Sequence, residues 1–392
     1  MANNKRICIL ILILLLIYAD GLYCMKASSK DLGACYGSEE MTRIEFVAFI
    51  NRTFGLEEKI HADFKDVSSG DYFITELQKA KAEGYIKGYE DGSFRPFNKI
   101  NRQEAATILY RLMRLSSLKN CQGRFSDTDE VPLWSRDIIN AVVEAGYMEE
   151  CDDMRFCPAK ALTWDEARDI VERTAGTVLN DTANGEEAIQ GNALISRGNV
   201  RLANKTIQGN LCLSSGIRDG AVELYNVTVK GRTIICGGNE IAIRDSIMGE
   251  AVIDKGRGQL LKLTASGMTR TGDVTVVSRA YIRENANPGI AFSNIFLEQG
   301  IGEGEEVRLN GAFLSVTVNT PGVRLIMGEH SLLGTLNLNE KTEVLGGGML
   351  GTVNINVNAE GSTIRQKPGR INGDTSHLFI IEKPISLSLP VH

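Results

Sequence analysis

The residue combinations that mark many enzymes and metal sites are missing from this chain of 392 residues. Its four histidines, His61, His330, His377 and His392, are isolated from one another, and its eight cysteines contain no Cys-x-x-Cys pair. A zinc site built from the usual His and Cys ligands is therefore not expected. Neither a Ser-His-Asp nor a Cys-His catalytic set can be nominated. We predict no catalytic residue, no metal ion and no cofactor.

Positive charge and long apolar runs are also scarce. The net charge of -6 argues against nucleic acid as a partner, because phosphate binding needs a basic surface. The uncharged apolar run at residues 7–19 is shorter than the ~20 residues that cross a bilayer. It follows Lys5 and Arg6 and precedes Asp20. We therefore predict a signal peptide at residues 1–19, export from the cell and no membrane attachment after cleavage.

An internal repeat stands out among the features that are present. Nine positions between Phe64 and Glu104 recur in the same order between Phe125 and Glu166, which indicates a repeat architecture. They are Phe64, Asp66, Tyr72, Gly84, Tyr85, Asp91, Phe94, Pro96 and Glu104, which align with Phe125, Asp127, Trp134, Gly146, Tyr147, Asp153, Phe156, Pro158 and Glu166. Each unit is predicted to hold a helix (Tyr72 to Glu83, then Ser135 to Glu144) ended by glycine, an extended Phe-x-Pro segment and a second helix.

Three helix starts share one local signature. The segments 42–45, 101–104 and 163–166 each place Thr or Asn three residues before Glu. This spacing predicts a capping box, in which each side chain bonds to the backbone N–H of the other residue. Glu45, Glu104 and Glu166 are therefore predicted to be helix caps rather than ligands of a bound molecule.

With these motifs, residues 35–176 resemble the S-layer homology (SLH) family. Its repeats carry a Phe-x-Asp-Val opening, a Gly-Tyr-x-Asp-Gly-x-Phe-x-Pro middle and a Thr-Arg-Ala-Glu helix start, which residues 64–67, 88–96 and 101–104 match closely. The resemblance implies an all-α bundle of three repeats in residues 20–176, with units at about 26–60 (partial), 61–118 and 122–176. The third unit departs from the motif at three positions, which carry Glu150, Cys157 and Trp164.

The resemblance also implies a function. SLH repeats dock exported bacterial proteins non-covalently onto a secondary cell-wall polysaccharide with anionic groups such as pyruvate ketals. Arg43 and Arg102, each at a helix start beside exposed backbone N–H groups, would contact the anion. Three residues would shape the adjacent loop, namely Gly88, Tyr89 and Asp91. Tyr72 and Trp134 either offer flat faces to sugar rings or belong to the core.

The second half of the chain has a strand-and-turn pattern. After a linker at residues 177–190, short apolar pairs separated by Gly, Asn and Asp recur in three interleaved series with one shared period. The first series is Val200/Leu202, Val222/Leu224, Ile241/Ile243 and Leu261/Leu263. Three short strands per coil predict a right-handed parallel β-helix over residues 191–392, so the whole chain is a multidomain α + β protein. A β-sandwich is the alternative.

Outward positions of the first series are predicted to be Arg201, Glu223, Ala242 and Lys262. This mixed row lacks the clustered carboxylates of a polysaccharide-cleaving site. It favours a structural or surface-layer role at the wall, with other surface-layer proteins as further partners. Two alternatives stay open: a wall-tethered polysaccharide lyase or hydrolase, and a glycan-binding adhesin.

Four cysteines are disulfide candidates, since thiols outside the cell can oxidise. Cys151 and Cys157 flank the turn that corresponds to Tyr89–Arg95 in the preceding unit, so a bridge there would replace lost turn contacts. Cys212 and Cys236 fall on the same series in successive coils. They are predicted either to form a bridge or to stay as two buried thiols.

Overall fold

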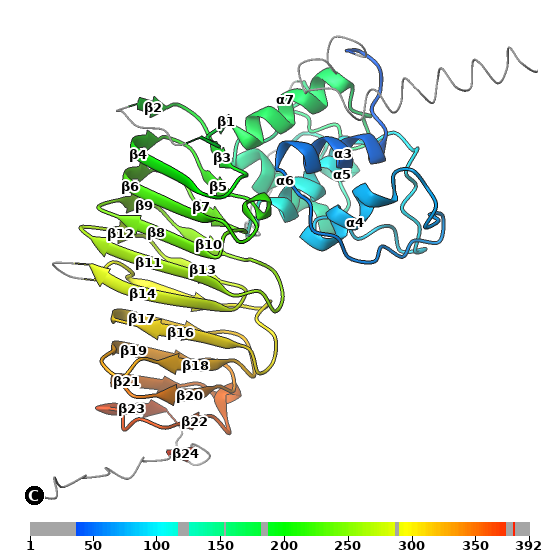
Figure 1. Cartoon of the computed structure of the whole chain (residues 1–392). Coiled ribbons are helices and arrows are strands. Elements are labelled where there is room, and N and C mark those ends of the chain that lie inside the picture. The colour runs from blue at the N-terminus through cyan, green and yellow to red at the C-terminus, as the bar shows by residue number, and fades with distance from the viewer. Residues whose placement is uncertain are drawn as a thin grey trace, which may run out of the picture. The chain divides into compact units, whose positions relative to one another are not determined.

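The computed structural model describes residues 37–116, 125–152, 154–181, 187–286, 290–373 and 379–380 (Figure 1). The chain forms two compact units: the first holds the residues up to Thr53 and Glu58–Thr174, and the second holds Phe54–Glu57 and Ala175–His392. The predicted signal peptide lies outside the described residues. In the part of the chain that is described, no helix is both long and apolar enough to cross a bilayer.

The first unit is helical, as the repeat pattern predicts. Its elements are α3 (Arg43–Thr53), α4 (Ile74–Glu83), α5 (Arg102–Leu112), the short 3-10 helix η1 (Thr128–Glu130), α6 (Leu133–Glu144) and α7 (Trp164–Ala175). The glycine stop is confirmed for α4, where Gly84 adopts φ 80° and its N–H donates to the carbonyls of Ala80 and Lys81. Glycine tolerates this left-handed conformation without a steric penalty.

The predicted capping boxes are confirmed at all three helix starts. Before α5, the Asn101 side chain accepts from the Glu104 N–H at 2.8 Å, and the Glu104 carboxylate accepts from the Asn101 N–H at 3.2 Å. The same reciprocal pair joins Thr42 with Glu45 before α3 and Thr163 with Glu166 before α7. Each box satisfies backbone donors that the helix itself leaves open.

Three backbone hydrogen bonds form a closed ring at the centre of the helical unit. The Met41 N–H donates to Leu162 at 2.9 Å, the Leu162 N–H donates to Ile100 at 2.9 Å, and the Ile100 N–H donates to Met41 at 3.0 Å. All three residues are fully buried. Each lies two residues before a helix, so the ring holds the starts of α3, α5 and α7 around one point.

Carbonyl groups from other segments cover these helix starts. The Arg43 N–H donates to the carbonyl of Asn98 at 2.9 Å, and the Arg102 N–H donates to the carbonyl of Lys160 at 3.0 Å. The Trp164 N–H likewise donates to Glu39 at 2.9 Å. The expectation that backbone N–H groups are exposed beside the motif arginines is therefore wrong, because the extended segments pass over the helix ends and use these donors.

The second unit is a parallel β-helix of two sheets whose coils stack along one axis (Figure 1). The 11-stranded sheet contains β1 (Thr177–Val178), β3 (Ala193–Ile195), β5 (Leu211–Leu213), β7 (Thr233–Ile235), β10 (Ala251–Ile253), β13 (Val274–Val276), β15 (Asn294–Leu297), β17 (Ala312–Val318), β19 (Leu332–Leu338), β21 (Met349–Ile355) and β23 (Arg370–Gly373).

The 13-stranded sheet contains β2 (Glu187–Ile189), β4 (Val200–Ile207), β6 (Ala221–Val229), β8 (Glu240–Arg244), β9 (Ile247–Met248), β11 (Leu261–Gly267), β12 (Arg270–Thr271), β14 (Ala280–Ala286), β16 (Glu306–Asn310), β18 (Arg324–Met327), β20 (Glu343–Gly346), β22 (Thr363–Ile364) and β24 (Phe379–Ile380). Strands of successive coils pair in parallel, as β4 with β6 and β6 with β8. This pairing confirms the β-helix and excludes the antiparallel sandwich.

Apolar side chains fill the interior of the β-helix in columns. Leu202, Leu224, Ile243 and Ala265 occupy one register position in four successive coils, and each is buried. Full burial of such a leucine or isoleucine stabilises the fold by about 1.5–3 kcal/mol relative to exposure. The alternation of apolar and polar residues in the sequence therefore reflects inward and outward positions on each strand.

A column of left-handed residues marks one corner of the coils. Four residues that each follow a position paired between successive coils have positive φ. They are Asn204, Asn226, Asp245 and Gly267, with φ of 56°, 51°, 51° and 62°. Asn, Asp and Gly are the residues that adopt this region most readily. In β4 and β6 the strand continues through the corner, so the first two predicted series share one bent strand there.

Two sequence-based assignments in the β-helix need correction. Strands β1 and β2 lie inside the segment predicted to be a linker, because short strands are hard to recognise in a stretch rich in Gly and Asn. The outward row continues from Ala242 to Thr264 rather than to Lys262, which lies beside Glu240. A shift by two residues keeps the same side chains facing inward, so the apolar pattern cannot detect it.

Candidate functional site

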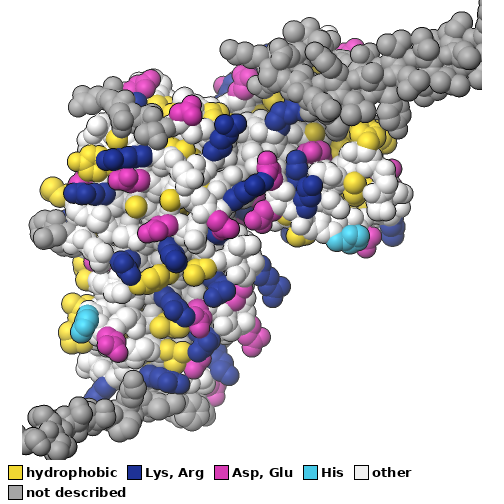
Figure 2. Space-filling view, viewed as in Figure 1, with side chains coloured by type: hydrophobic (Ala, Val, Ile, Leu, Met, Phe, Trp, Pro, Cys, Tyr) yellow, Lys and Arg dark blue, Asp and Glu magenta, His cyan; other side chains and the backbone are white. Residues whose placement is uncertain are grey.

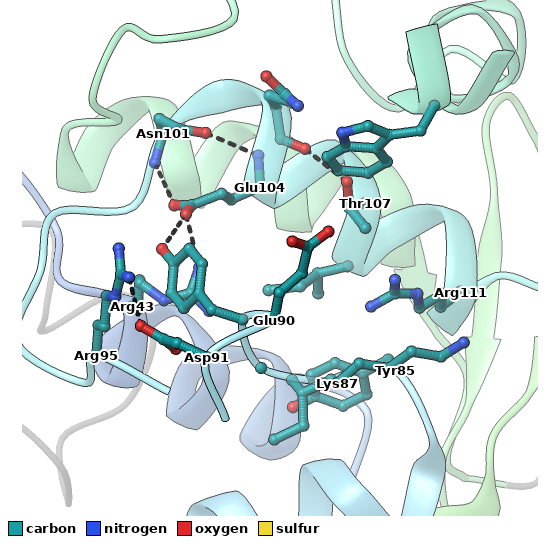
Figure 3. Close-up of a pocket in the computed structure, with 16 residues that line it drawn as sticks. Arg43, Tyr85, Lys87, Glu90, Asp91, Arg95, Asn101, Glu104, Thr107 and Arg111 are labelled. Carbon is teal, nitrogen blue, oxygen red and sulfur yellow. Dashed lines mark hydrogen bonds and ion pairs between the residues drawn. The ribbon is translucent and has the colours of Figure 1, made fainter. Parts of the chain in front are cut away.

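A cavity of about 590 Å³ lies in the helical unit (Figure 3). Its lining comes from the segment 85–91, from α5 and its cap, from Arg43 and from the start of α6. Five of the seven predicted binding residues meet here: Arg43, Gly88, Tyr89, Asp91 and Trp134. The predicted residues Arg102 and Tyr72 are not part of this lining.

Arg43 is committed to the protein rather than open to the cavity. The residue is only 7% exposed. Its Nε donates to the Phe94 carbonyl at 3.0 Å, and one terminal nitrogen lies 3.1 Å from the Glu104 carboxylate. The guanidinium also packs on the rings of Tyr89 and Phe94 at 4.7 and 4.8 Å. Arg43 therefore fixes the positions of groups that line the cavity.

Tyr89 is held at the cavity wall by two arginines and a carboxylate. Its hydroxyl donates to Glu104, and the Arg95 guanidinium lies 4.1 Å from the ring centroid. Burial and the hydrogen bond to Glu104 raise the pKa of Tyr89 to about 12. The phenol is therefore neutral over the whole physiological range, and its ring is fixed against Arg43.

The rest of this loop is closed by local polar contacts. Asp91 accepts from the Ser93 hydroxyl at 2.6 Å and forms an ion pair with Arg95 at 2.8 Å. These hydrogen bonds hold the pKa of Asp91 well below its usual range. Gly88 has φ 74°, and a Cβ there would lie 2.8 Å from the Phe64 ring. The loop therefore needs glycine at this position.

Two cations of the cavity, Arg111 and Lys87, were not singled out by the motifs (Figure 3). Arg111 is half-buried near the end of α5, and burial lowers its pKa. Lys87 is exposed at the start of the loop. Within the described residues, neither side chain forms an ion pair. Three carboxylates line the same cavity, those of Glu90, Asp91 and Glu104, and the last two are paired with arginines. No motif marks Arg111, because a basic residue in the last turn is ordinary in helices.

Arg102 occupies the position of Arg43 in the next segment but does not reach the cavity. It is 6% exposed, its Nε donates to the Phe156 carbonyl at 2.7 Å, and it also donates to the Glu149 carbonyl. Its guanidinium lies 4.8 Å from the Phe156 ring, and burial lowers its pKa. Arg102 thus joins two segments through backbone carbonyls and is not part of the lining of this cavity.

The two positions that align with Lys87 and Arg111 in the following unit carry one negative and one positive side chain. Glu149 and Arg173 stand there, and their side chains form an ion pair at 2.7 Å. A carboxylate at the first position thus neutralises the guanidinium at the second. The excess of positive charge in the unit 61–118 has no counterpart at these positions of the unit 122–176.

The two predicted disulfides have different outcomes. The sulfur atoms of Cys151 and Cys157 are joined, with Cα atoms 6.2 Å apart. No bond joins Cys212 to Cys236, both of which are buried. Cys212 lies opposite Ile234, two residues before Cys236. One strand spacing and two residues along the strand separate the Cα atoms by roughly 8 Å, beyond the ~7 Å that a disulfide spans.

The two predicted aromatic platforms are on the surface. Tyr72 is 53% exposed and Trp134 is 61% exposed, so the alternative that they belong to the core is wrong. Tyr72 packs edge to face on Phe73 with centroids 5.2 Å apart. Trp134 is the second residue of α6 and lines the cavity.

Comparison with known proteins finds a family model that matches part of the helical unit. The model of the S-layer homology domain matches residues 63–106, which include the segment 85–91 and the start of α5. A surface layer protein of Brevibacillus choshinensis is 34% identical over 88 residues, 21% of this chain and 8% of that protein. The S-layer protein EA1 of Bacillus anthracis is 27% identical over 153 residues, 39% of this chain and 17% of that protein.

An amylopullulanase of Thermoanaerobacterium thermosulfurigenes is 27% identical over 140 residues, 34% of this chain and 7% of the enzyme. The chain thus spans less than a fifth of the length of each of these relatives. Their names cover both surface-layer proteins and a carbohydrate-active enzyme, so the similarity does not point to one activity. The chain carries an S-layer homology domain, followed by a parallel β-helix.

Proposed function

We propose that the helical unit anchors this protein to the bacterial cell wall by binding an anionic secondary cell-wall polysaccharide. The S-layer homology domain implies wall anchoring, and the similarity to surface-layer proteins agrees with it. The β-helix would then be displayed outside the cell in a structural or surface-layer role, next to other surface-layer proteins. Export would depend on the signal peptide at residues 1–19.

The observation that carries this proposal is the pair of cations in the cavity, Arg111 and Lys87. Arg111 is partly removed from water and, among the described residues, has no carboxylate partner. A guanidinium in this state gains strongly from a carboxylate ligand, which it can bind with two parallel hydrogen bonds. A pyruvate ketal on the polysaccharide presents such a carboxylate, and Lys87 would add a second positive charge.

Trp134 supplies an apolar contact at the same site. Its indole is exposed and lines the cavity that contains Arg111. An aromatic face can cover the C–H groups of a sugar ring while the ring's polar groups stay hydrated. We assign recognition of the anionic group to Arg111 and Lys87, and packing of the sugar to Trp134. Gly88, Tyr89 and Asp91 shape the loop that carries Lys87.

Arg43 and Arg102 act in this proposal as positioning residues. Arg43 holds the Phe94 carbonyl, Tyr89 and Glu104, so its removal would distort the cavity without removing a direct ligand contact. Arg102 makes the equivalent clamp to Phe156. Tyr72 is proposed to serve a sugar at another part of the surface.

The finer architecture is part of the proposal. The ring of Met41, Ile100 and Leu162 supports three SLH-type units within residues 20–176, arranged with approximate threefold symmetry. The β-helix is proposed to be right-handed, since nearly all parallel crossover connections have that hand.

Sedimentation of the protein with purified cell-wall sacculi tests the function. We expect the wild-type protein to pellet with intact sacculi but not with sacculi stripped of their attached polysaccharide. Arg111→Ala should weaken this binding about 10- to 100-fold, the range for a lost charge-assisted hydrogen bond of about 1.5–3 kcal/mol.

Arg173→Ala is the matched control, because Arg173 is the paired counterpart of Arg111 in the following unit. It should pellet like the wild type. Equal binding to stripped and intact sacculi, or an Arg111→Ala variant that binds normally, would refute the proposed site.

A further inference from the structure

Cations are spread over the outer face of the 13-stranded sheet, at several register positions. Five successive strands, β8, β11, β14, β16 and β18, contribute one outward cation each: Arg244, Lys262, Arg283, Arg308 and Arg324. Successive coils are separated by the usual strand spacing of about 4.8 Å. Figure 2 shows Lys and Arg side chains recurring along the visible coils of the β-helix, with acidic groups between them.

Two of these five cations form no ion pair within the described part of the chain, and the others do. Arg308 and Arg324 share the carboxylate of Glu306, at 2.7 and 2.9 Å. Lys262 and Arg283 are exposed, and neither has an ion pair within the described residues. The neighbouring acidic residue is Glu240, beside Lys262 on the preceding strand. Although the chain has a net charge of -6, this surface is locally cationic.

Tyr281 lies at the centre of the open cations. It is paired in register with Lys262 on one side and with Arg308 on the other. Its hydroxyl oxygen accepts from Arg283 at 3.0 Å and from Asn310 at 3.2 Å. These two hydrogen bonds, together with the charges of Arg283 and Arg308, lower the pKa of Tyr281. Because the phenol oxygen is the acceptor in both hydrogen bonds, its O–H remains available to donate to a further acceptor.

The surface around Tyr281 is shallow and contains further polar groups. Thr264 lies beside Arg283 in register, and Asn310 lies on the other side of Arg283. Ala242 precedes Thr264 in the same column. Small side chains between long cationic ones give a shallow surface that an extended chain can follow across several coils.

We propose that the surface formed by Lys262, Tyr281, Arg283, Arg308 and Asn310 binds an extended polysaccharide that bears carboxylates, laid along the axis of the coils. Lys262, Arg283 and Arg308 lie on three neighbouring strands around Tyr281 and can meet carboxylates that repeat along such a polymer. The phenol, the hydroxyl of Thr264 and the amide of Asn310 would bond to sugar hydroxyls. This is a second glycan contact on the β-helix. It is separate from the cavity of the helical unit and goes beyond the anchoring role.

Titration of the full-length protein with polygalacturonate, a linear chain of carboxylated sugars, tests this proposal. The wild-type protein should bind it, more weakly as salt rises, and should not bind the fully methyl-esterified polymer. Lys262→Glu with Arg283→Glu should weaken binding at least tenfold. The milder pair Lys262→Gln with Arg283→Gln should also weaken it, and thermal unfolding should show that both variants fold.

The matched control is Lys230→Glu with Lys341→Glu, which makes the same change in net charge at two exposed lysines outside the proposed surface. It should bind within twofold of the wild type. The proposal is overturned if the control loses as much affinity as the charge-reversed pair, if the methyl ester binds equally well, or if polyphosphate binds and polygalacturonate does not. In an Arg111→Ala background, Lys262→Glu with Arg283→Glu should still weaken polygalacturonate binding at least tenfold, which separates this test from that of wall anchoring.

Discussion

Two corresponding loops of the helical unit, at 88–96 and 150–158, share backbone contacts at their described residues but differ in side chains. In the first, the Asp66 carboxylate accepts from the N–H groups of Phe94 and Arg95, both at 2.7 Å. In the second, Asp127 accepts from Phe156 and Cys157 at 2.9 and 2.7 Å. Arg95 and Cys157 even share a left-handed backbone, with φ of 56° and 54°.

The way each loop is closed differs. Arg95 packs on Tyr89 and pairs with Asp91 in the first loop, whereas a disulfide joins the corresponding positions 151 and 157 in the second. The cations Lys87 and Arg111 of the unit 61–118 occupy the positions that hold the ion pair of Glu149 and Arg173 in the unit 122–176. The comparison separates residues that build the frame, which both units keep, from residues that give one cavity its charge.

The largest effect on stability is expected from substituting the arginines that hold the backbone frame. Arg43→Ala would break the largely buried ion pair with Glu104 and remove the side-chain donor to the Phe94 carbonyl, so we expect unfolding free energy to fall by about 3–5 kcal/mol. Arg102→Ala should cost a similar amount. Chemical unfolding of the full chain, followed by circular dichroism, measures both. Arg111→Ala should hardly change stability; a stable Arg43→Ala that merely loses wall binding would show that Arg43 is a ligand contact instead.

The two loop closures should differ in strength. Cys151→Ser with Cys157→Ser removes the cross-link of a short loop and should lower unfolding free energy by about 2 kcal/mol. Arg95→Ala in the first loop should cost less, because its ion pair with Asp91 is exposed to solvent. Equilibrium unfolding with and without reductant gives both values. Equal losses in the two loops, or no effect of the reductant on the wild type, would contradict this ranking.

A smaller change tests the charge difference between the two repeats. Glu90→Gln removes one of the carboxylates that line the cavity with Arg111, the one that forms no ion pair among the described residues, so we expect wall polysaccharide to bind roughly twofold to fivefold more tightly, about 0.5–1 kcal/mol. Asp152→Asn, at the corresponding position of the second loop, is the control and should change nothing. Sedimentation at several protein concentrations measures both. A parallel gain in the two variants would mean that overall charge, not this cavity, sets affinity.

The smallest effect concerns alkaline pH. The pKa of Tyr89 is about 12 in the folded chain and about 10.0 when unperturbed. Between these values the unfolded chain loses the proton while the folded chain keeps it, so this contribution to stability is intact below pH 10 and declines as pH rises toward 12. Tyr89→Phe should make the decrease of unfolding free energy with pH less steep, by the contribution of one proton. An unchanged slope in unfolding experiments across this range would show that Tyr89 titrates normally.

Local rules explain why much of the helical unit was predictable. A capping box needs only residues three apart, and Gly84 ends α4 through its own conformation, so both could be located from the sequence. Arg43 was assigned to the ligand because its motif position suggests exposure at a helix start. Its actual partner, the Phe94 carbonyl, lies 51 residues later in the chain and belongs to a segment whose path no local pattern records.

The cavity's cations escaped prediction for a related reason. Arg111 differs from Arg173 only through its neighbour, Lys87 in one unit and Glu149 in the other. In the β-helix, the apolar alternation gave the fold but not the register of β11, since Leu261, Leu263 and Ala265 all point inward and any of them could have opposed Ile241. The same insensitivity placed Cys212 opposite Cys236, although the strands align it with Ile234.

The ring of hydrogen bonds between Met41, Ile100 and Leu162 makes the helical unit indivisible. Each member gives one bond and receives one, so cutting out any of the three segments would leave a donor and an acceptor stranded in a dry interior. A fragment with two segments is thus not a smaller version of the unit. New ends placed between segments, by circular permutation with the old ends joined, would keep every bond of the ring and should still yield a folded protein.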